Sequence, residues 1–514
     1  MKNYIIGIGG TGAKCLEHLL HCCSSGLGPD NLWVGMVDQD EANGNVSRTK
    51  ILLSKYKNLR NKLRDEAGHD LAKDSNLFRT NVSSNSDSVW LPLGGADPTL
   101  EEVIYYELLK TEVKGLIDCL YDDHQKKLKL SKGFRGVTSV GAVAMLATTA
   151  NEDDPFWSQI YKAIESARGG EEVKVFIISS IFGGTGAAGF PNIARRIKRI
   201  QEEKNVTSNF HLGGALMLPY FNYQVPEENM EHEIFAKPEE FLDQTKGALD
   251  YYAKLFEHDK IFDQVYVTGW DPLSKLTNFK VGGNLQNNPP LFPELYSALG
   301  ALKFFSTDNK ISENQEIFHI GKNDTNEILW SDIPNVSNNL NSKVNIAKLI
   351  RFAFSYNWMY GPALTGSWSK IKKYSNENWF KRLIYKQTYN IDTKACEVGH
   401  EKNQEVILSM KEYCEDVLIW ITDMQYSTVL NTDQKMDLIV SNFFSEFKAK
   451  NTSNRVTIKE KLNASEKNQF NELISDSKNL KLLNVMSNIC YKKTNRNQRG
   501  LGVFMDILFR SCEQ

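Results

Sequence analysis

The sequence predicts an α/β fold built on a largely parallel β-sheet. Short apolar runs with the composition of buried strands alternate with stretches of helical periodicity through residues 1–305. Two of these runs end in glycine clusters, at residues 7–12 and 183–189, and each cluster precedes a helical stretch. Strands that alternate with helices are joined by crossover connections, which favour parallel pairing.

The individual elements follow in chain order. Strands are expected at residues 4–6, 32–37, 173–181, 211–218 and 262–268, and helices at 13–24, 97–121, 154–167, 191–204 and 238–256. The segment 41–90 is polar, which predicts an insertion that carries an exposed helix near residues 50–66. A final helix at 291–305 is apolar nearly all round, so we expect this central helix to be buried.

The character of the chain changes near residue 306. One strand-like run at 316–320 is followed by helical patterns at 344–358, 405–425, 435–449, 470–492 and 500–511. We therefore predict two domains: a sheet domain at 1–305 and a largely helical α+β C-terminal domain at 306–514.

Composition excludes several classes of protein. The 514 residues carry 61 Lys and Arg against 63 Asp and Glu, and this balance argues against a protein held on nucleic acid by bulk charge. The start of the chain has no apolar region typical of a signal peptide, and no stretch reaches the roughly 18 apolar residues of a membrane span. The eight cysteines form no C-x-x-C pair, so a reducing, cytoplasmic location is expected.

The first glycine cluster reads Gly7-Ile8-Gly9-Gly10-Thr11-Gly12. Backbone N–H groups at a helix start bind phosphate, and glycine leaves that approach open. The cluster fits G-x-G-x-x-G, and Asp38 follows the second strand where a dinucleotide site places its ribose-binding acid. A Rossmann-like NAD or FAD enzyme is one interpretation, and a strand–helix turn without a ligand is another. A P-loop is disfavoured because Ala13 stands where its lysine belongs.

The second cluster reads Phe182-Gly183-Gly184-Thr185-Gly186-Ala187-Ala188-Gly189. It resembles the signature of the tubulin and FtsZ superfamily, a strand followed by G-G-G-T-G-S/A-G, with Phe182 in place of the first glycine. The resemblance is to the divergent bacterial tubulin-like proteins and covers residues 1–305.

The resemblance implies a tubulin-type GTPase domain that binds GTP or GDP with Mg²⁺ and assembles head to tail into filaments. Asp38 and Asp40 would lie near the metal and the phosphates, and the loop at 133–141 near the γ-phosphate. Asn288, before the central helix, would read the guanine. The implied nucleotide-binding residues are Gly9, Gly10, Thr11, Gly12, Asp38, Asp40, Gly183, Gly184, Thr185, Gly186, Ala187, Pro219 and Asn288.

The sequence departs from the family pattern after the central helix. Polymerising members carry a motif close to Asn-x-Asp-x-x-Asp there, whose acids act on the nucleotide of the neighbouring subunit. Here only Asp308 and Glu313 are available for that catalytic role. An alternative is therefore a poorly hydrolysing nucleotide-binding scaffold or sensor in a bacterial multi-protein system, such as phage defence or plasmid maintenance. Its partner would bind the C-terminal domain.

Overall fold

The computed structural model describes most of the chain in two compact units. The described residues are 1–63, 70–73, 75–85, 89–134, 136–223, 241–258, 260–276, 283–284, 286–307, 315–322, 327–365, 378–384, 401–431, 435–440, 473–475 and 500–513. Unit 1 comprises Met1–Leu19, Asn31–Ile51 and Val82–Thr325, and unit 2 comprises Leu20–Asp30, Leu52–Asn81 and Asn326–Gln514. Each unit is therefore built from three segments that are not contiguous in the sequence.

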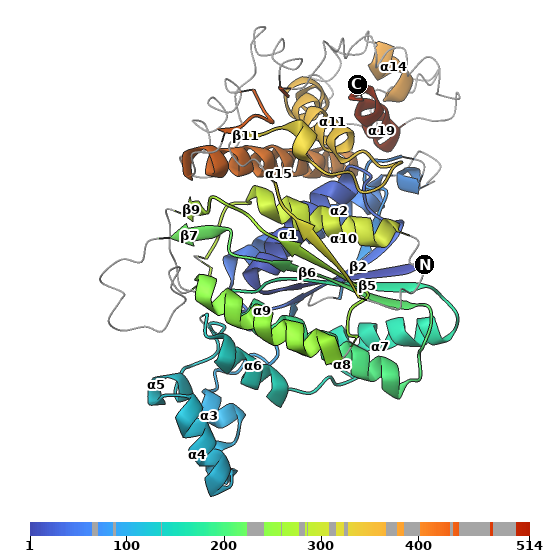
Figure 1. Ribbon diagram of the computed structural model, residues 1–514. Helices are drawn as coiled ribbons and strands as arrows, with labels where there is room; N and C mark the ends of the chain where they lie inside the picture. The colour runs from blue at the N-terminus through green and yellow to red at the C-terminus, as the bar shows by residue number, and fades with distance from the viewer. Residues whose placement is uncertain are drawn as a thin grey trace. The chain divides into compact units, whose positions relative to one another are not determined.

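The central sheet has eight strands, and every strand pair with a described register is parallel (Figure 1). Its order is β10-β8-β6-β5-β1-β2-β3, and β4 also pairs with β2. The strands are β1 (Lys2–Ile8), β2 (Asn31–Val37), β3 (Asn81–Ser83), β4 (Val89–Trp90), β5 (Val173–Ser180), β6 (Phe210–Met217), β8 (Gln264–Thr268) and β10 (Glu316–Ile320). The predicted parallel α/β fold is confirmed. Strand β10, expected in the C-terminal part, forms the edge of this sheet instead.

Helices cover both faces of the sheet (Figure 1). One face carries α1 (Gly9–Ser24) and α10 (Phe292–Ser306), and the other carries α7 (Pro155–Arg168), α8 (Gly184–Glu203) and α9 (Phe241–His258). The short strands β7 (Phe221–Tyr223) and β9 (Ser274–Leu276) pair beside the sheet. Both central strands, β5 and β6, are buried along their whole length, as expected for parallel strands covered on both faces.

The central helix α10 is buried as predicted and is held by a charged residue at each end. Glu294 lies in its first turn, and the Lys174 ammonium donates to the carbonyls of Phe304, Phe305 and Thr307 in its last turn. A negative charge at the start and a positive charge at the end both stabilise the helix dipole.

Both glycine clusters form the first turn of a helix, which corrects the predicted helix starts. Helix α1 begins at Gly9 rather than at residue 13, and α8 begins at Gly184 rather than at residue 191. Glycine and proline are typical of turns, so the sequence pattern suggested later starts. Pro191 instead lies inside α8.

Tyr252 compensates for the hydrogen bond that Pro191 removes. Pro191 has no N–H, so the carbonyl of Ala187, four residues earlier, lacks its helical donor. The Tyr252 hydroxyl, from α9, donates to this carbonyl at 2.5 Å. The first turn of α8 is thereby tied to α9.

We predict that Tyr252→Phe lowers the free energy of unfolding by about 1 to 3 kcal/mol, because the buried Ala187 carbonyl loses its donor. In a Pro191→Ala background the backbone N–H is restored, so the same substitution should cost about 1 kcal/mol less. Chemical denaturation of the four proteins measures both costs. An equal cost in both backgrounds would contradict this role for Tyr252.

The predicted helix at 97–121 is broken into shorter pieces. Tyr105, with φ of 51°, separates α3 (Leu100–Val103) from the following 3₁₀ turn η2 (Tyr106–Leu108). Then follow α4 (Thr111–Leu120), α5 (Asp123–Lys126) and α6 (Thr138–Ala147). Figure 1 shows α3, α4 and α5 as an arm that projects from the sheet region of unit 1.

Unit 2 is mostly helical in its described part. Its elements include η1 (Leu71–Lys73), β11 (Glu327–Ile328), η5 (Trp330–Asp332), α11 (Ser342–Ser355), the π-helix η6 (Tyr356–Tyr360), α12 (Gly361–Leu364), α14 (Asn378–Leu383), α15 (Glu401–Asn431), β12 (Lys435–Met436) and α19 (Leu501–Ser511). The helix predicted at 435–449 is wrong at its start, where Lys435–Met436 form β12. Residues 441–449 and most of the helix predicted at 470–492 lie outside the described residues.

Helix α2 (Gly44–Lys62) corrects the prediction of an exposed helix in the segment 41–90. Its apolar residues Leu52, Leu53, Tyr56 and Leu59 are buried, and the Tyr56 ring lies 4.9 Å from that of Phe78. These residues recur at helical spacing, but the many Lys, Arg and Asn residues between them made the apolar face difficult to recognise in the sequence.

No helix in the described part of the chain is long and apolar enough to cross a membrane.

Candidate functional site

The two glycine-rich turns meet at the point where the sheet reverses its strand order. Strands β1 and β5 are neighbours, with Gly7 paired to Ile178, and they lead into α1 and α8. From β1 the order continues through β2 to β3, whereas from β5 it continues through β6 and β8 to β10. In open α/β sheets, ligands bind outside the carboxyl ends of the strands at this switch point.

Several of the glycines are required by close packing. A Cβ added at Gly12 would lie 2.7 Å from the Gly7 carbonyl carbon and 2.8 Å from the Ile178 oxygen. A Cβ at Gly186 would lie 2.7 Å from Ser179 Oγ. Gly9 has φ of +69°, and its Cβ would lie 3.4 Å from Gly186 N, so the two turns are adjacent. Glycine here lets both helices approach the sheet, so these residues serve packing as well as any approach by a phosphate.

These turns place two helix N-termini side by side. The first four N–H groups of a helix have no acceptor within the helix, and the helix dipole adds partial positive charge there. Gly9, Gly10, Thr11 and Gly12 form the first turn of α1; Gly184, Thr185, Gly186 and Ala187 form that of α8, with Gly183 as its N-cap. Of these residues, Gly10, Thr11 and Gly183 are partly exposed, so an anion could reach them.

Asp38, just after β2, connects the turn that follows this strand to the first turn of α8. Its Oδ1 accepts from the Asp40 N–H at 3.1 Å and from the Thr185 hydroxyl at 3.4 Å, and its Oδ2 accepts from Asn43 Nδ2 at 3.2 Å. Burial raises the pKa of Asp38 to about 7, although the hydrogen bonds from the Asp40 N–H and the Thr185 hydroxyl lower it. This bonding is typical of a residue that positions loops.

Asp40 bonds the segment that precedes α10 and lies beside the loop that follows the arm. Its Oδ2 accepts from the Gly283 N–H at 2.6 Å, burial raises its pKa, and the nearby Lys132 ammonium partly offsets that rise. A Cβ at Gly133 would lie 3.6 Å from both Asp40 Cβ and Thr185 Oγ1. The loop at 133–141, expected near the γ-phosphate, therefore begins beside both predicted phosphate-binding segments.

The residues before α10 are hydrogen-bonded to the first turn of α2. The Gly44 N–H donates to Gly283 O, the Asn45 N–H to Gln286 O, and the Asn288 N–H to Asn45 Oδ1 at 2.9 Å. Residues 283, 284 and 286–288 are called the strap below.

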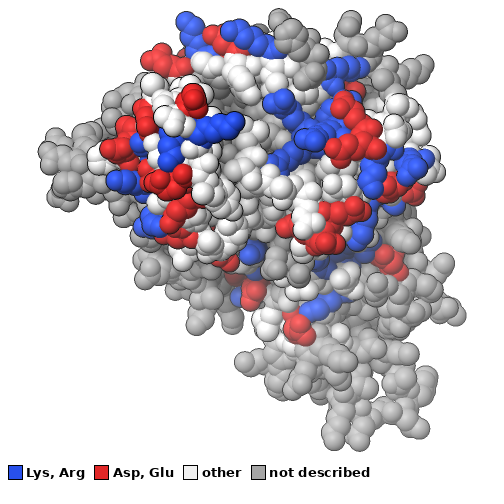
Figure 2. Space-filling view, turned by 90° about the horizontal axis from the view of Figure 1, so that it is seen from below, with Lys and Arg blue, Asp and Glu red and all other residues white. Residues whose placement is uncertain are grey.

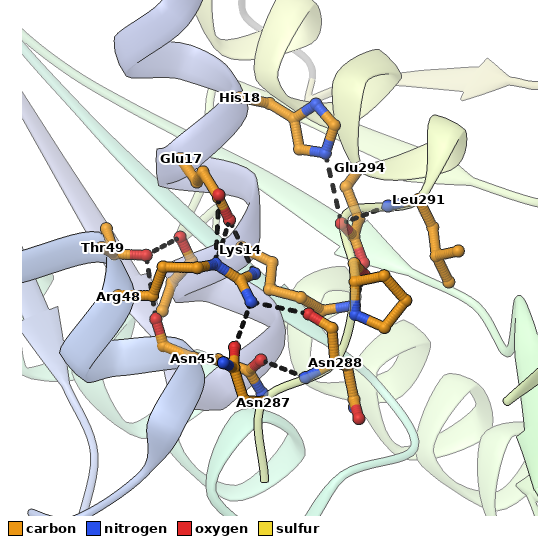
Figure 3. A network of polar contacts seen from close by, with 12 residues as sticks. Lys14, Glu17, His18, Asn45, Arg48, Thr49, Asn287, Asn288, Leu291 and Glu294 are labelled. Atoms are coloured by element: carbon orange, nitrogen blue, oxygen red, sulfur yellow. Dashed lines mark hydrogen bonds and ion pairs between the residues drawn. The ribbon is translucent and has the colours of Figure 1, made fainter. Parts of the chain in front are cut away.

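Arg48 of α2 fixes the end of the strap (Figure 3). Its guanidinium forms an ion pair with Glu17 at 2.7 Å and donates to the backbone carbonyl of Asn288 at 2.8 Å and to the side chain of Asn287. Both backbone polar groups of Asn288 are therefore engaged, one by Asn45 and the other by Arg48.

A buried polar network lies behind the strap (Figure 3). Glu294 forms an ion pair with Lys14 and accepts from Tyr220 at 2.6 Å and from the Leu291 N–H at 3.0 Å, while His18 lies 3.3 Å away. Burial alone would raise the pKa of Glu294, but Lys14 and His18 outweigh it and lower the pKa to about 2.

This network bears on two predicted features of the site. The Lys14 ammonium is bonded to Glu294, which agrees with the argument against a P-loop lysine. Thr11 lies close enough to the buried Tyr220 hydroxyl to oppose the rise in the Tyr220 pKa that burial and Glu294 cause, so the network reaches the first glycine turn.

Comparisons with known proteins do not place the chain in a family. No protein-family model matches it, and neither a curated protein nor a solved structure does. The functional argument therefore depends on the geometry of the site.

The structure brings together most of the predicted nucleotide-binding residues. The two glycine turns, Asp38 and Asp40 lie at one edge, Pro219 is buried next to Tyr220 at the end of β6, and Asn288 ends the strap. The predicted catalytic acids Asp308 and Glu313 lie outside the described residues.

Sequence reasoning missed the residues that support this edge. These are Asn43, Asn45, Arg48, Lys132, Gln286 and Glu294. The amides at Asn43 and Asn45, directly after Asp38 and Asp40, were a usable signal, because polar side chains after a parallel strand collect at its carboxyl edge.

The described residues contain no cluster of three or more His, Cys, Asp or Glu that could hold a metal ion by itself. Magnesium is usually bound by one or two carboxylates together with substrate phosphates. The neighbouring Asp38 and Asp40 fit that requirement, so Mg²⁺ would reach this edge with a phosphate ligand.

We predict that the protein without ligand loses stability as the pH rises from about 4 to 7. The folded state holds a proton on Asp38 that the unfolded state releases, so the free energy of unfolding should fall by up to about 1.4 kcal/mol per pH unit. Asp38→Asn should flatten this slope, whereas Asp153→Asn at an exposed acid should not. Denaturation at several pH values provides the test, and an unchanged slope in Asp38→Asn would refute it.

Proposed function

We propose that this chain binds GTP, with the phosphates between the N-terminal turns of α1 and α8. The observation that carries the proposal is the meeting of two glycine-rich helix starts at the switch point of the sheet. Converging backbone N–H groups and two helix dipoles suit a ligand with several negative charges. A phosphate chain is such a ligand.

The charges around the site support a role for Mg²⁺. Asp38 and Asp40 lie at the edge where the phosphates would bind, and Lys14 is engaged by Glu294. Phosphates beside carboxylates repel one another unless a cation lies between them. Mg²⁺ bound with the nucleotide would supply this neutralisation, with Asp40 and Asp38 as its protein ligands.

The nucleobase would lie toward the strap. Asn288 is the strap residue whose backbone is held from two sides, and the resemblance to tubulin-like proteins assigns the guanine-reading amide to this position. The order β3-β2-β1-β5-β6-β8 also agrees with the doubly wound order of nucleotide-binding sheets. The strand order supports a nucleotide of either kind, and the position of Asn288 favours guanine.

A dinucleotide such as NAD is the less favoured ligand. In that reading Asp38 would bind a ribose hydroxyl, whereas here it contacts Thr185 in the second glycine turn. A simple dinucleotide site also has no use for the second glycine turn at α8.

We predict that the protein retains or takes up GTP and that Thr185→Arg abolishes this binding. The new side chain would fill the space between the two helix starts, because Thr185 lies beside Gly9 and Gly133. Glu202→Arg, an exposed position near the end of the same helix, is the matched control. Chromatography of heat-released nucleotide and titration calorimetry identify the ligand. NAD in the heat-released fraction, or GTP binding retained by Thr185→Arg, would refute the proposed site.

We further propose that GTP and Mg²⁺ drive head-to-tail assembly, as the resemblance implies. A contact that does not close on itself produces filaments. Light scattering and pelleting should rise with GTP and Mg²⁺ in the wild type and in Glu202→Arg, but not in Thr185→Arg. Binding without assembly over a wide range of protein concentration would favour the nucleotide-binding scaffold or sensor instead.

A further inference from the structure

Helix α4 of the arm has no buried residue. A helix of ten residues is only marginally stable in water by itself, and most helices in proteins are stabilised by packing of an apolar face. Such a face is present in α4: Val113, Leu116 and Leu120 are 41%, 58% and 60% exposed, and Ile117 lies among them. The spacing i, i+3, i+4, i+7 places these four side chains in one stripe.

The charges next to the stripe are largely paired within the arm. Lys114 bonds Glu107 at 3.2 Å, and Lys126 bonds Asp118 at 2.7 Å and Asp123 at 3.0 Å. Figure 2 shows this end of unit 1 from below, where positive and negative side chains are interspersed with uncharged surface. A surface of this kind does not attract a strongly basic or strongly acidic partner.

Of the charged residues at the ends of α4, Glu112 in the first turn suits the helix dipole, whereas Lys110 and the two acids after the helix do not. Lys110 is exposed at the N-cap, where a positive charge opposes the helix dipole. Asp122 and Asp123 follow its C-terminus and are exposed, where negative charge opposes the dipole as well. Beside a second helix that runs in the opposite direction, both charges would instead face a complementary end.

We propose that α4 is the contact of a symmetric dimer, in which the α4 helices of two copies of this chain pack antiparallel. The stripe is symmetric about the midpoint between Leu116 and Ile117, so Val113 would face Leu120 of the second copy. Lys110 would lie near the acids that follow the second α4. A twofold axis repeats each of these contacts, which is the self-complementarity that an isologous interface requires.

The surface available is small compared with that of a stable dimer, so association is expected at about 1 to 100 µM protein. This dimer does not depend on the proposed nucleotide site. It should form without GTP and persist in Thr185→Arg.

Sedimentation equilibrium of the full chain without nucleotide tests the proposal. We expect a reversible monomer–dimer equilibrium in the wild type and a loss of affinity of about a hundredfold in Leu116→Glu, because the charges of the two copies would meet at the axis. Leu242→Glu, at a similarly exposed leucine of α9, should leave the dimer intact. Circular dichroism confirms that each variant is folded.

Charge exchange and cross-linking test the orientation. Lys110→Glu should weaken the dimer, and the added Asp123→Lys should restore it. Leu116→Cys in a Cys119→Ser background should form a disulfide-linked dimer under mild oxidation. A chain that stays monomeric throughout this concentration range, or a dimer unaffected by Leu116→Glu, would overturn the proposal. A failure of restoration by Asp123→Lys would overturn the antiparallel arrangement.

Discussion

The buried ion pair between Lys14 and Glu294 is the interaction on which the candidate site depends. Two charges removed from water cost several kcal/mol each, and their attraction offsets this cost only if the remaining polar groups are also bonded. Here Tyr220, His18 and the Leu291 N–H complete the shell of Glu294. Because these groups come from α1, the end of β6 and the start of α10, only one arrangement of the three elements satisfies them all.

That arrangement determines where the rest of the site lies. The start of α10 fixes the end of the strap, and the strap is bonded through Asn45 and Arg48 to the segment that follows Asp38. Asp38 in turn contacts Thr185 in the first turn of α8. Apolar residues of equal volume could stabilise the fold as well as the ion pair does. We infer that the polar network serves mainly to fix the relative positions of these elements and adds less to the stability of the fold.

The sequence predicted the layers of the fold well but not the contacts between distant segments. Buried strands such as β5 and the helix α10 were recognisable because their apolar residues are nearly continuous. The start of α8 was placed late because glycine and Pro191 usually end helices, and tertiary contacts outweighed that tendency here. The predicted glycine turns and acids meet as expected for neighbouring parallel strands. The pairing of Lys14 with Glu294 joins residues 280 positions apart, and no local pattern encodes such a pair.

The bond between Tyr252 and the Ala187 carbonyl has a consequence for how this sequence can change over time. A proline at position 191 leaves the Ala187 carbonyl without its helical donor. It is therefore acceptable only while another group, here the Tyr252 hydroxyl, donates to that carbonyl. The two positions should therefore vary together among related chains: where the proline is replaced, the tyrosine becomes free to drift to phenylalanine. A chain that acquired Tyr252 first could then accept Pro191 with little loss of stability. In the reverse order, the intermediate with Pro191 but without Tyr252 would be less stable.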